Sequence, residues 1–140
     1  EEYYETPIGK ANVLQKGSDV SIVAASCMVQ EAVKAAEALE KEGISCEVVD
    51  LRTLKPLDLE AIIKSVEKTG RAVVSIGEWG YASVAASVVK GIYDEMFGRL
   101  KAPVQMVTLP DCPAPASRSL EEAYYIDAED IESAVRRAIL

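Results

Sequence analysis

The stretch Gly43–Asp58, with the sequence GISCEVVDLRTLKPLD, carries charged and polar side chains directly after an apolar run that favours a buried strand. The side chains that follow this run are Asp50, Arg52, Thr53 and Lys55. In a parallel α/β sheet, residues just beyond the carboxyl end of a strand are free to carry function. The stretch therefore raises the question of whether these groups catalyse a reaction, bind a partner or hold the loop.

Phosphorylation is the chemistry that an aspartate at a strand end, such as Asp50, most readily offers. It requires Mg²⁺ held by further carboxylates, together with a lysine, from neighbouring strand ends. The strand expected at Val20–Ala25 is followed by Ser26 with no acid, and the strand expected at Pro103–Thr108 is followed by Leu109 with no lysine. The sequence therefore disfavours a phospho-acceptor site, which stays open as a minor alternative.

Histidine is absent from the 140 residues. This absence excludes Ser-His-Asp and Cys-His catalysis, histidine-ligated metals and histidine general bases on this chain. Three cysteines, Cys27, Cys46 and Cys112, are spaced too widely for a zinc knuckle, and their odd number does not suit a disulfide framework, so they favour a reducing compartment. We expect Cys27 and Cys46 to be core residues.

A nucleotide-binding loop requires glycines between the first strand and its helix, so that backbone N–H groups approach the phosphate. The turn Ala25–Met28 contains no glycine, and the loop Gly77–Gly80 lacks the spacing of the dinucleotide motif. The net charge is −8 and the sequence has no basic stripe, which argues against a nucleic-acid partner. No apolar run approaches the length of a membrane span.

The elements that position these residues alternate between strands and helices, which predicts one doubly wound α/β/α sandwich. The predicted strands are Ala11–Gln15, Val20–Ala25, Cys46–Asp50, Arg71–Ile76 and Pro103–Thr108, the last of them expected as a central strand. The predicted helices are Met28–Glu42, Leu59–Lys68, Tyr81–Phe97, Ser119–Tyr125 and Asp127–Leu140. Residues 1–10 are expected as a linker or extended arm, and residues 11–140 as the domain.

Helix ends follow from capping residues. Ser26, Asp58 and Asp127 are the predicted N-caps, with Asp130 completing a capping box for the last helix, and Gly43 is expected to close the first helix. Between Leu109 and Ser117 three prolines forbid regular structure and predict an ordered crossing loop.

Several segments in one order resemble a known family. They are PIGKA, GISCEVVDLRTLKPLD, SVEKTGRAVVSIGE and KAPVQMVTLPDCPAPASRSLEEAYYIDAEDI. Together they resemble the carboxyl-terminal domain of the transketolase superfamily, and more narrowly that of the beta subunit of the thiamine-diphosphate-dependent 2-oxo acid dehydrogenase first component, of the pyruvate, acetoin or branched-chain type. The sharpest segment is the Asp-x-Pro-x-Pro-x-Ser run from Asp111 to Ser117.

The resemblance implies a five-stranded, mostly parallel sheet with one antiparallel strand, assigned to Ala11–Gln15. It also implies that thiamine diphosphate, Mg²⁺ and the catalytic histidine belong to other parts of the enzyme, and that this domain binds no cofactor and is inactive alone. Its implied role is assembly, with contacts to an alpha subunit and a second beta subunit in an α2β2 tetramer. A cytoplasmic location, or the mitochondrial matrix in a eukaryote, follows from the same family.

The resemblance further implies docking to the acyltransferase core through acids and the chain terminus, here Leu140. Lys101 stands where relatives often carry an acid, which puts the conventional docking contact in question. The candidate interface residues are Asp50, Arg52, Trp79, Tyr81, Lys101, Asp111 and Leu140. Two simpler interpretations stay open: Asp50 and Arg52 pair only with each other, and Trp79 and Tyr81 cover the core. A stand-alone binding or regulatory module with the same fold is the alternative function.

Overall fold

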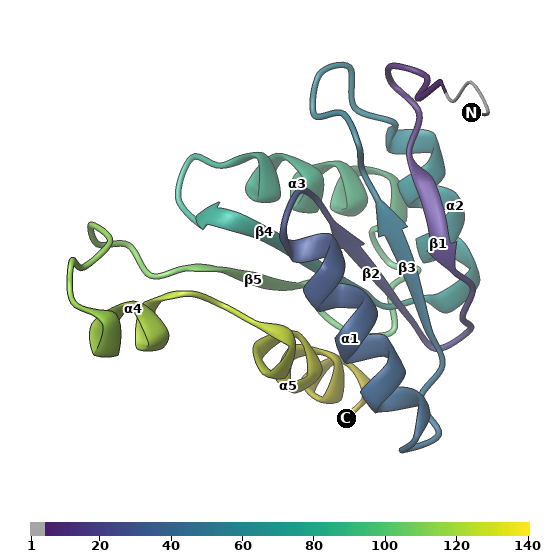
Figure 1. Cartoon of the computed structure of the whole chain (residues 1–140). Helices are drawn as coiled ribbons and strands as arrows, with labels where there is room; N and C mark the ends of the chain where they lie inside the picture. The colour runs from purple at the N-terminus through teal and green to yellow at the C-terminus, as the bar shows by residue number, and fades with distance from the viewer. Residues whose placement is uncertain (1–4) are drawn as a thin grey trace.

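A mixed sheet of five strands forms the middle layer of the computed structural model, which describes residues 5–140 (Figure 1). The strands are β1 (Asn12–Gln15), β2 (Val20–Ala24), β3 (Cys46–Asp50), β4 (Ala72–Trp79) and β5 (Gln105–Leu109). Their order is β1-β3-β2-β4-β5, with β1 antiparallel to β3 and the other pairs parallel. The predicted sandwich and its antiparallel strand are confirmed. Of the expected arm 1–10, residues 1–4 lie outside the described residues.

Helices cover both faces of this sheet. They are α1 (Met28–Glu40), α2 (Leu59–Thr69), α3 (Val84–Met96), α4 (Arg118–Tyr124) and α5 (Ala128–Ile139). Helices α1 and α5 pack on one face and α2 and α3 on the other, whereas α4 stands apart at one end (Figure 1). Within the described residues, no helix is both long and apolar enough to cross a bilayer.

Each face has its own hydrophobic core because side chains alternate along the buried strands. On β2, Ile22 contributes to the core under α1 and α5, and Val23 contributes to the core under α2 and α3. Both side chains are fully buried. Burial of one such side chain is worth about 1.5–3 kcal/mol, so the two cores supply most of the driving force for folding.

Two helix caps form as the sequence predicts. The Asp58 carboxylate accepts a hydrogen bond from the Ala61 N–H at 3.2 Å, at the start of α2. Asp127 and Asp130 form the reciprocal capping box of α5. The predicted cap at Ser26 is wrong: Ser26 has a φ of 57°, and Cys27 occupies the cap position without a side-chain hydrogen bond. The chain reverses sharply between β2 and α1, which places Ser26 in a left-handed conformation.

Two predictions about strands are corrected. Strand β5 lies at the edge of the sheet and not in its centre, because only β4 pairs with it. Strand β4 continues through Gly77 and Glu78 to Trp79, which were expected as a loop, because Trp79 still pairs with Leu109 of β5. The apolar pattern ends at Ile76, whereas pairing with a neighbouring strand carries β4 further toward its carboxyl end.

Candidate functional site

The seven candidate interface residues lie at two opposite ends of the strands. The side of the sheet where the parallel strands end is called its carboxyl edge, and the side where they begin its amino edge. Asp50, Arg52, Trp79, Tyr81 and Asp111 lie at or just beyond the carboxyl ends of β3, β4 and β5. Lys101 precedes β5 and Leu140 follows α5, so both lie at the amino edge. The fold therefore brings five of the seven to one edge, the one where α/β sheets usually place their ligands.

Asp50 and Arg52 form a local pair. The Arg52 N–H donates to Asp50 Oδ1 at 3.0 Å, and the Arg52 Nε lies 3.8 Å from Asp50 Oδ2. A partly exposed pair of this kind is worth about 0–1 kcal/mol. The predicted pairing is present, and a contact of these residues with another subunit stays a prediction.

The loop after β3 also holds the incoming segment, that is, the residues just before β1. Thr53 Oγ1 accepts a hydrogen bond from the Gly9 N–H at 2.9 Å, and Asp58 Oδ2 accepts one from the Ala11 N–H at 3.0 Å. The Asp58 carboxylate thus serves α2 and the incoming segment with its two oxygens. Sequence reasoning identified Asp58 as a cap and missed its second role, because no local pattern links residue 58 to residue 11.

A projecting arm, residues 110–125, extends from the end of β5 and ends with α4 (Figure 1). One hydrogen bond fastens it to β4, since Trp79 Nε1 donates to Tyr124 Oη at 3.0 Å. A second bond lies within the arm, where Tyr124 Oη donates to the Cys112 carbonyl at 3.1 Å. Tyr124 is buried, and its ring meets that of Tyr125 edge to face. The arm is therefore braced, although it stands away from both cores.

Large apolar side chains are exposed around this arm. The exposed fraction is 49% for Trp79 and 85% for Tyr81, and Leu120 and Tyr125 on or next to α4 are more than half exposed. Tyr81 is therefore too exposed to be a lid over the core, whereas a covering role of the half-buried Trp79 stays a prediction. Aromatic side chains of this kind are enriched at protein interfaces.

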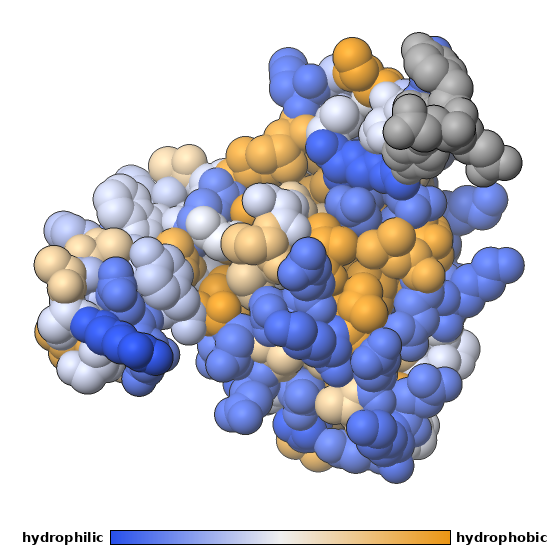
Figure 2. Space-filling view, in the orientation of Figure 1, coloured by the Kyte–Doolittle hydropathy of each residue, from blue (hydrophilic) through white to orange (hydrophobic). Residues whose placement is uncertain are grey.

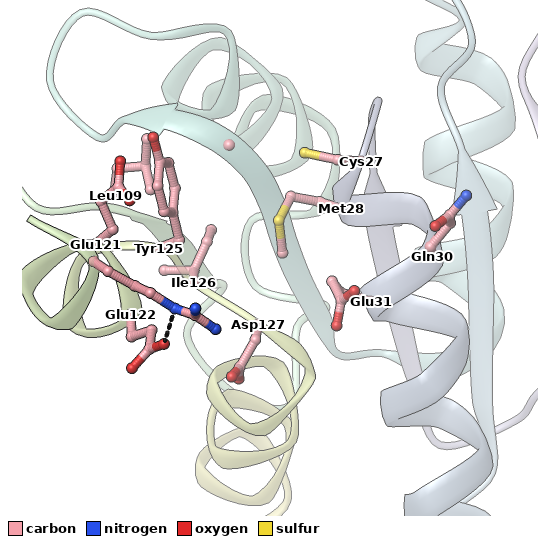
Figure 3. Close-up of a pocket in the computed structure, with 12 residues that line it drawn as sticks. Cys27, Met28, Gln30, Glu31, Leu109, Glu121, Glu122, Tyr125, Ile126 and Asp127 are labelled. Atoms are coloured by element: carbon pink, nitrogen blue, oxygen red, sulfur yellow. Dashed lines mark hydrogen bonds and ion pairs between the residues drawn. The ribbon is translucent and has the colours of Figure 1, made fainter. Parts of the chain in front are cut away.

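A cavity of about 780 Å³ lies between α1 and the projecting arm, at the carboxyl ends of β4 and β5 (Figure 3). Cys27 and Met28 of its lining follow β2, so the cavity also reaches the point between β2 and β4 where the order of the strands reverses. The charged side chains of its lining are Glu31, Arg118, Glu121, Glu122 and Asp127. Figure 2 shows the arm separated from the body by a hollow with hydrophobic side chains visible between them.

The cavity does not fit the diphosphate of a thiamine cofactor. Four carboxylates face one guanidinium there, so a ligand with several negative charges would be repelled. The turn at Ser26–Cys27 also lacks the glycines that let backbone N–H groups approach a phosphate. Among residues 5–140, no cluster of three or more histidine, cysteine or acidic side chains is arranged to hold a metal ion.

The cysteines differ from expectation at one position. Cys27 is exposed and lines the cavity, so its assignment to the core is wrong: it follows the end of β2 and lies over Gly77 at the sheet edge. Cys46 is buried as expected, and Cys112 is exposed on the projecting arm. Burial, with a smaller contribution from the charge of Asp19, raises the pKa of the Cys46 thiol to about 12.

Thiol reactivity should follow this difference. At pH 8 we expect Cys27 and Cys112 to react with an aromatic disulfide reagent in the folded protein, and Cys46 to react only after unfolding, because it is inaccessible and its thiolate is scarce. Absorbance of the released thiolate would measure this, with Cys46→Ala as the control that abolishes the slow phase alone. Three fast thiols in the native protein would contradict the burial of Cys46.

Lys101 has an internal role at the amino edge. Its ammonium donates to the Thr69 carbonyl at 3.0 Å, and its stem lies against Gly70, the left-handed residue that ends α2. A cation at the carboxyl end of a helix is favourable because it compensates the negative end of the helix dipole. The effect of Lys101 on docking stays a prediction, as does the role of Leu140, which is fully exposed.

Comparison with known proteins agrees with this geometry. The profile of the family described as "Transketolase, C-terminal domain" matches residues 9–131. The chain is 43% identical over 136 residues to the acetoin:2,6-dichlorophenolindophenol oxidoreductase subunit beta of Cupriavidus necator, covering 97% of this chain and 40% of that protein. It is 45% identical over 139 residues to the pyruvate dehydrogenase E1 component subunit beta of Bacillus subtilis, covering 99% and 42%.

Solved structures give the same result. A split-gene transketolase, described as an inactive β4 tetramer, superposes with a TM-score of 0.82 at 33% identity over 94% of this chain and 42% of that one. A 2-oxoglutarate:ferredoxin oxidoreductase from Magnetococcus marinus shares the fold, with a TM-score of 0.59 at 12% identity over 94% of this chain and 19% of that one. The chain spans about two fifths of the curated relatives it matches. The chain belongs to the transketolase C-terminal domain family.

Proposed function

We propose that this chain serves as the carboxyl-terminal assembly domain of the beta subunit of a thiamine-diphosphate-dependent 2-oxo acid dehydrogenase of the pyruvate or acetoin type. In the complete enzyme the reaction is oxidative decarboxylation of a 2-oxo acid, with transfer of the acyl group to a lipoyl carrier. Similarity to two such beta subunits over nearly the whole chain supports the assignment. The domain contributes contacts and no catalytic group, and the enzyme works in the cytoplasm, or in the mitochondrial matrix of a eukaryote.

The cofactor belongs elsewhere in this proposal. Thiamine diphosphate and Mg²⁺ are held by the alpha subunit and by another part of the beta subunit, in keeping with the acidic cavity described above. The partners are an alpha subunit, a second beta subunit and the acyltransferase core of the complex. The similar split-gene transketolase was solved as a β4 tetramer, which supports contacts between beta-type chains.

The observation that carries the assembly role is the projecting arm with its exposed aromatic neighbours. Folding alone gives no reason to expose Trp79 and Tyr81 at the end of β4, beside the arm that Trp79 braces, whereas a subunit contact would bury both. Asp50, Arg52 and Asp111 lie along the same edge and would form the polar rim of that contact.

Tyr81→Ala tests the proposal, with Phe97→Ala as a matched control. Both aromatic side chains are 85% exposed, but Tyr81 lies at the carboxyl edge and Phe97 follows α3 at the amino edge. An aromatic anchor at an interface contributes at least about 2 kcal/mol, so Tyr81→Ala should weaken the assembly of alpha and beta subunits about thirtyfold. Sedimentation velocity of the beta subunit that carries this domain, mixed with its alpha subunit, would measure the effect.

Phe97→Ala should leave assembly unchanged. Equal losses for the two variants would contradict a contact specific to the carboxyl edge. Unchanged assembly for Tyr81→Ala would exclude Tyr81 as an anchor and remove the main support for the proposal.

A further inference from the structure

The projecting arm has little internal support. Helix α4 within it has seven residues, and its cap residue Ser117 makes no side-chain hydrogen bond. A helix this short is not stable by itself in water, because nucleation costs more than one or two turns return. No residue of α4 belongs to either hydrophobic core. The position of the arm therefore depends on contacts that lie outside the backbone of α4.

Helix α1 does not supply this support. The cavity of about 780 Å³ lies between α1 and the arm, with Met28 and Glu31 on the side of α1 and Glu121 and Tyr125 on the side of the arm (Figure 3). The ion pair between Arg118 and Glu122 joins two residues of α4 to each other. The support for the arm must therefore come from its other side, where it meets β4.

One oxygen atom joins the arm to the sheet. Tyr124 Oη accepts a hydrogen bond from Trp79 Nε1 at 3.0 Å and donates one to the Cys112 carbonyl at 3.1 Å. A phenol hydroxyl is able to do both at once. Within residues 5–140, the bond from Trp79 is the one side-chain hydrogen bond between residues 110–125 and the rest of the domain. The hydroxyl thus connects β4, the beginning of the arm and its end.

The role of this hydroxyl can be separated from that of the ring. The ring of Tyr124 is buried and meets the ring of Tyr125 edge to face, with 5.2 Å between the centroids. Phenylalanine would fill the same space, so Tyr124→Phe removes the hydrogen bonds and leaves the packing in place. Water is able to replace the lost partner at Trp79, which is half exposed, and at Cys112, which is exposed.

We propose that the Tyr124 hydroxyl is the positioning group of the arm, and that it preforms the surface of Trp79, Tyr81 and Leu120 for the alpha subunit. The proposal deepens the assembly role proposed above and rests on it. A preformed surface binds more tightly because association does not have to order it. Without the hydroxyl, the arm samples other positions, and part of the binding free energy is used to order it.

Hydrogen exchange of the 140-residue chain tests the position of the arm. Tyr124→Phe should speed exchange of the protected amides of α4 about tenfold, because opening of the arm no longer breaks the two hydrogen bonds of the hydroxyl. Trp79 is the only tryptophan of the chain, and its emission should move to longer wavelength as water reaches the indole N–H.

Tyr93→Phe is the matched control. Tyr93 Oη accepts a hydrogen bond from the Val104 N–H at 3.1 Å, at the amino edge, so this variant removes the same group away from the arm. It should change neither the exchange of α4 nor the emission of Trp79. Trp79→Phe removes the donor of the bond to the arm, and in the Tyr124→Phe background it should add little to the exchange of α4.

Association of the beta subunit that carries this domain with its alpha subunit tests the consequence. Tyr124→Phe should weaken it about threefold to tenfold, the equivalent of one or two modest hydrogen bonds, and Tyr93→Phe should leave it unchanged. Thermal melting establishes that each variant is folded. Exchange of α4 in Tyr124→Phe that is no faster than in the unmodified chain would overturn the proposal, and so would a released arm with unchanged association.

Failure of the assembly role is distinguishable from failure of this proposal. If the unmodified beta subunit did not associate with the alpha subunit, the assembly role would be wrong. Exchange in the 140-residue chain does not depend on a partner, so it would still confirm or overturn the hydroxyl of Tyr124 as the group that positions the arm.

Discussion

Replacing Asp58 with alanine should lower the free energy of unfolding by about 2 kcal/mol. The loss of an N-cap typically costs about 1 kcal/mol, and a partly buried N–H left without an acceptor costs about 1 kcal/mol or more. Asp58 has both roles, because its two oxygens accept from Ala61 and Ala11. Urea unfolding would measure the loss, and hydrogen exchange should show faster exchange of the Ala11 amide.

Asp111→Ala is the matched control for this change. Asp111 is exposed on the projecting arm and makes no hydrogen bond or ion pair with other described residues, so its replacement should change stability by no more than about 0.5 kcal/mol. Similar losses of stability for Asp58→Ala and Asp111→Ala would indicate that removal of a negative charge causes the loss, and not removal of the hydrogen bonds of Asp58. Unchanged exchange at Ala11 in Asp58→Ala would show that the incoming segment is held by other contacts.

Replacing Gly17 with alanine should destabilise the fold more severely, by more than about 3 kcal/mol. A Cβ at residue 17 would collide with the carbonyl of Cys46 and the nitrogen of Glu47, which are backbone atoms of β3 and cannot turn aside. The close approach also lets the Gly17 N–H bond the Glu47 carboxylate. Burial pushes the pKa of Glu47 up, but hydrogen bonds from Lys68, Ser65 and Gly17 hold it below its ordinary value.

Gly43→Ala separates steric collision from backbone conformation. Gly43 has a φ of 83° and open space around its Cα, so alanine there costs only the left-handed conformation, about 1–2 kcal/mol. Thermal or urea unfolding would compare the loss of stability in Gly17→Ala with that in Gly43→Ala. A smaller loss for Gly17→Ala than for Gly43→Ala would mean that β3 and the turn before β2 separate easily, contrary to the close packing described here.

Much of the local structure follows from the sequence. Apolar runs such as Cys46–Asp50 predict strands, and Asp58 and Asp127 predict the starts of α2 and α5, because capping and burial patterns depend on residues close in the chain. The absence of histidine and of a glycine-rich turn restricts the chemistry that this chain performs. The segments around Asp111–Ser117 identify the family, which the match over residues 9–131 confirms.

Only the tertiary structure decides which of these residues meet. It decides how far apart Asp50, Trp79 and Asp111 lie along the carboxyl edge, because strand order determines which strand ends are neighbours. It also exposes Cys27, which stands between β2 and α1 and lies over Gly77 of β4. Long-range pairing sets such relations, so no window of sequence contains them.

The stretch Gly43–Asp58 shows the same division. From sequence it is a strand, a loop and a cap with charges of uncertain purpose. In the folded chain Asp50 pairs with Arg52, while Thr53 and Asp58 bind the backbone of the incoming segment. Residue types determine that Thr53 and Asp58 are able to accept hydrogen bonds. Their donors in the incoming segment lie more than forty residues away in sequence, and only the packing of β1 beside β3 brings them into reach.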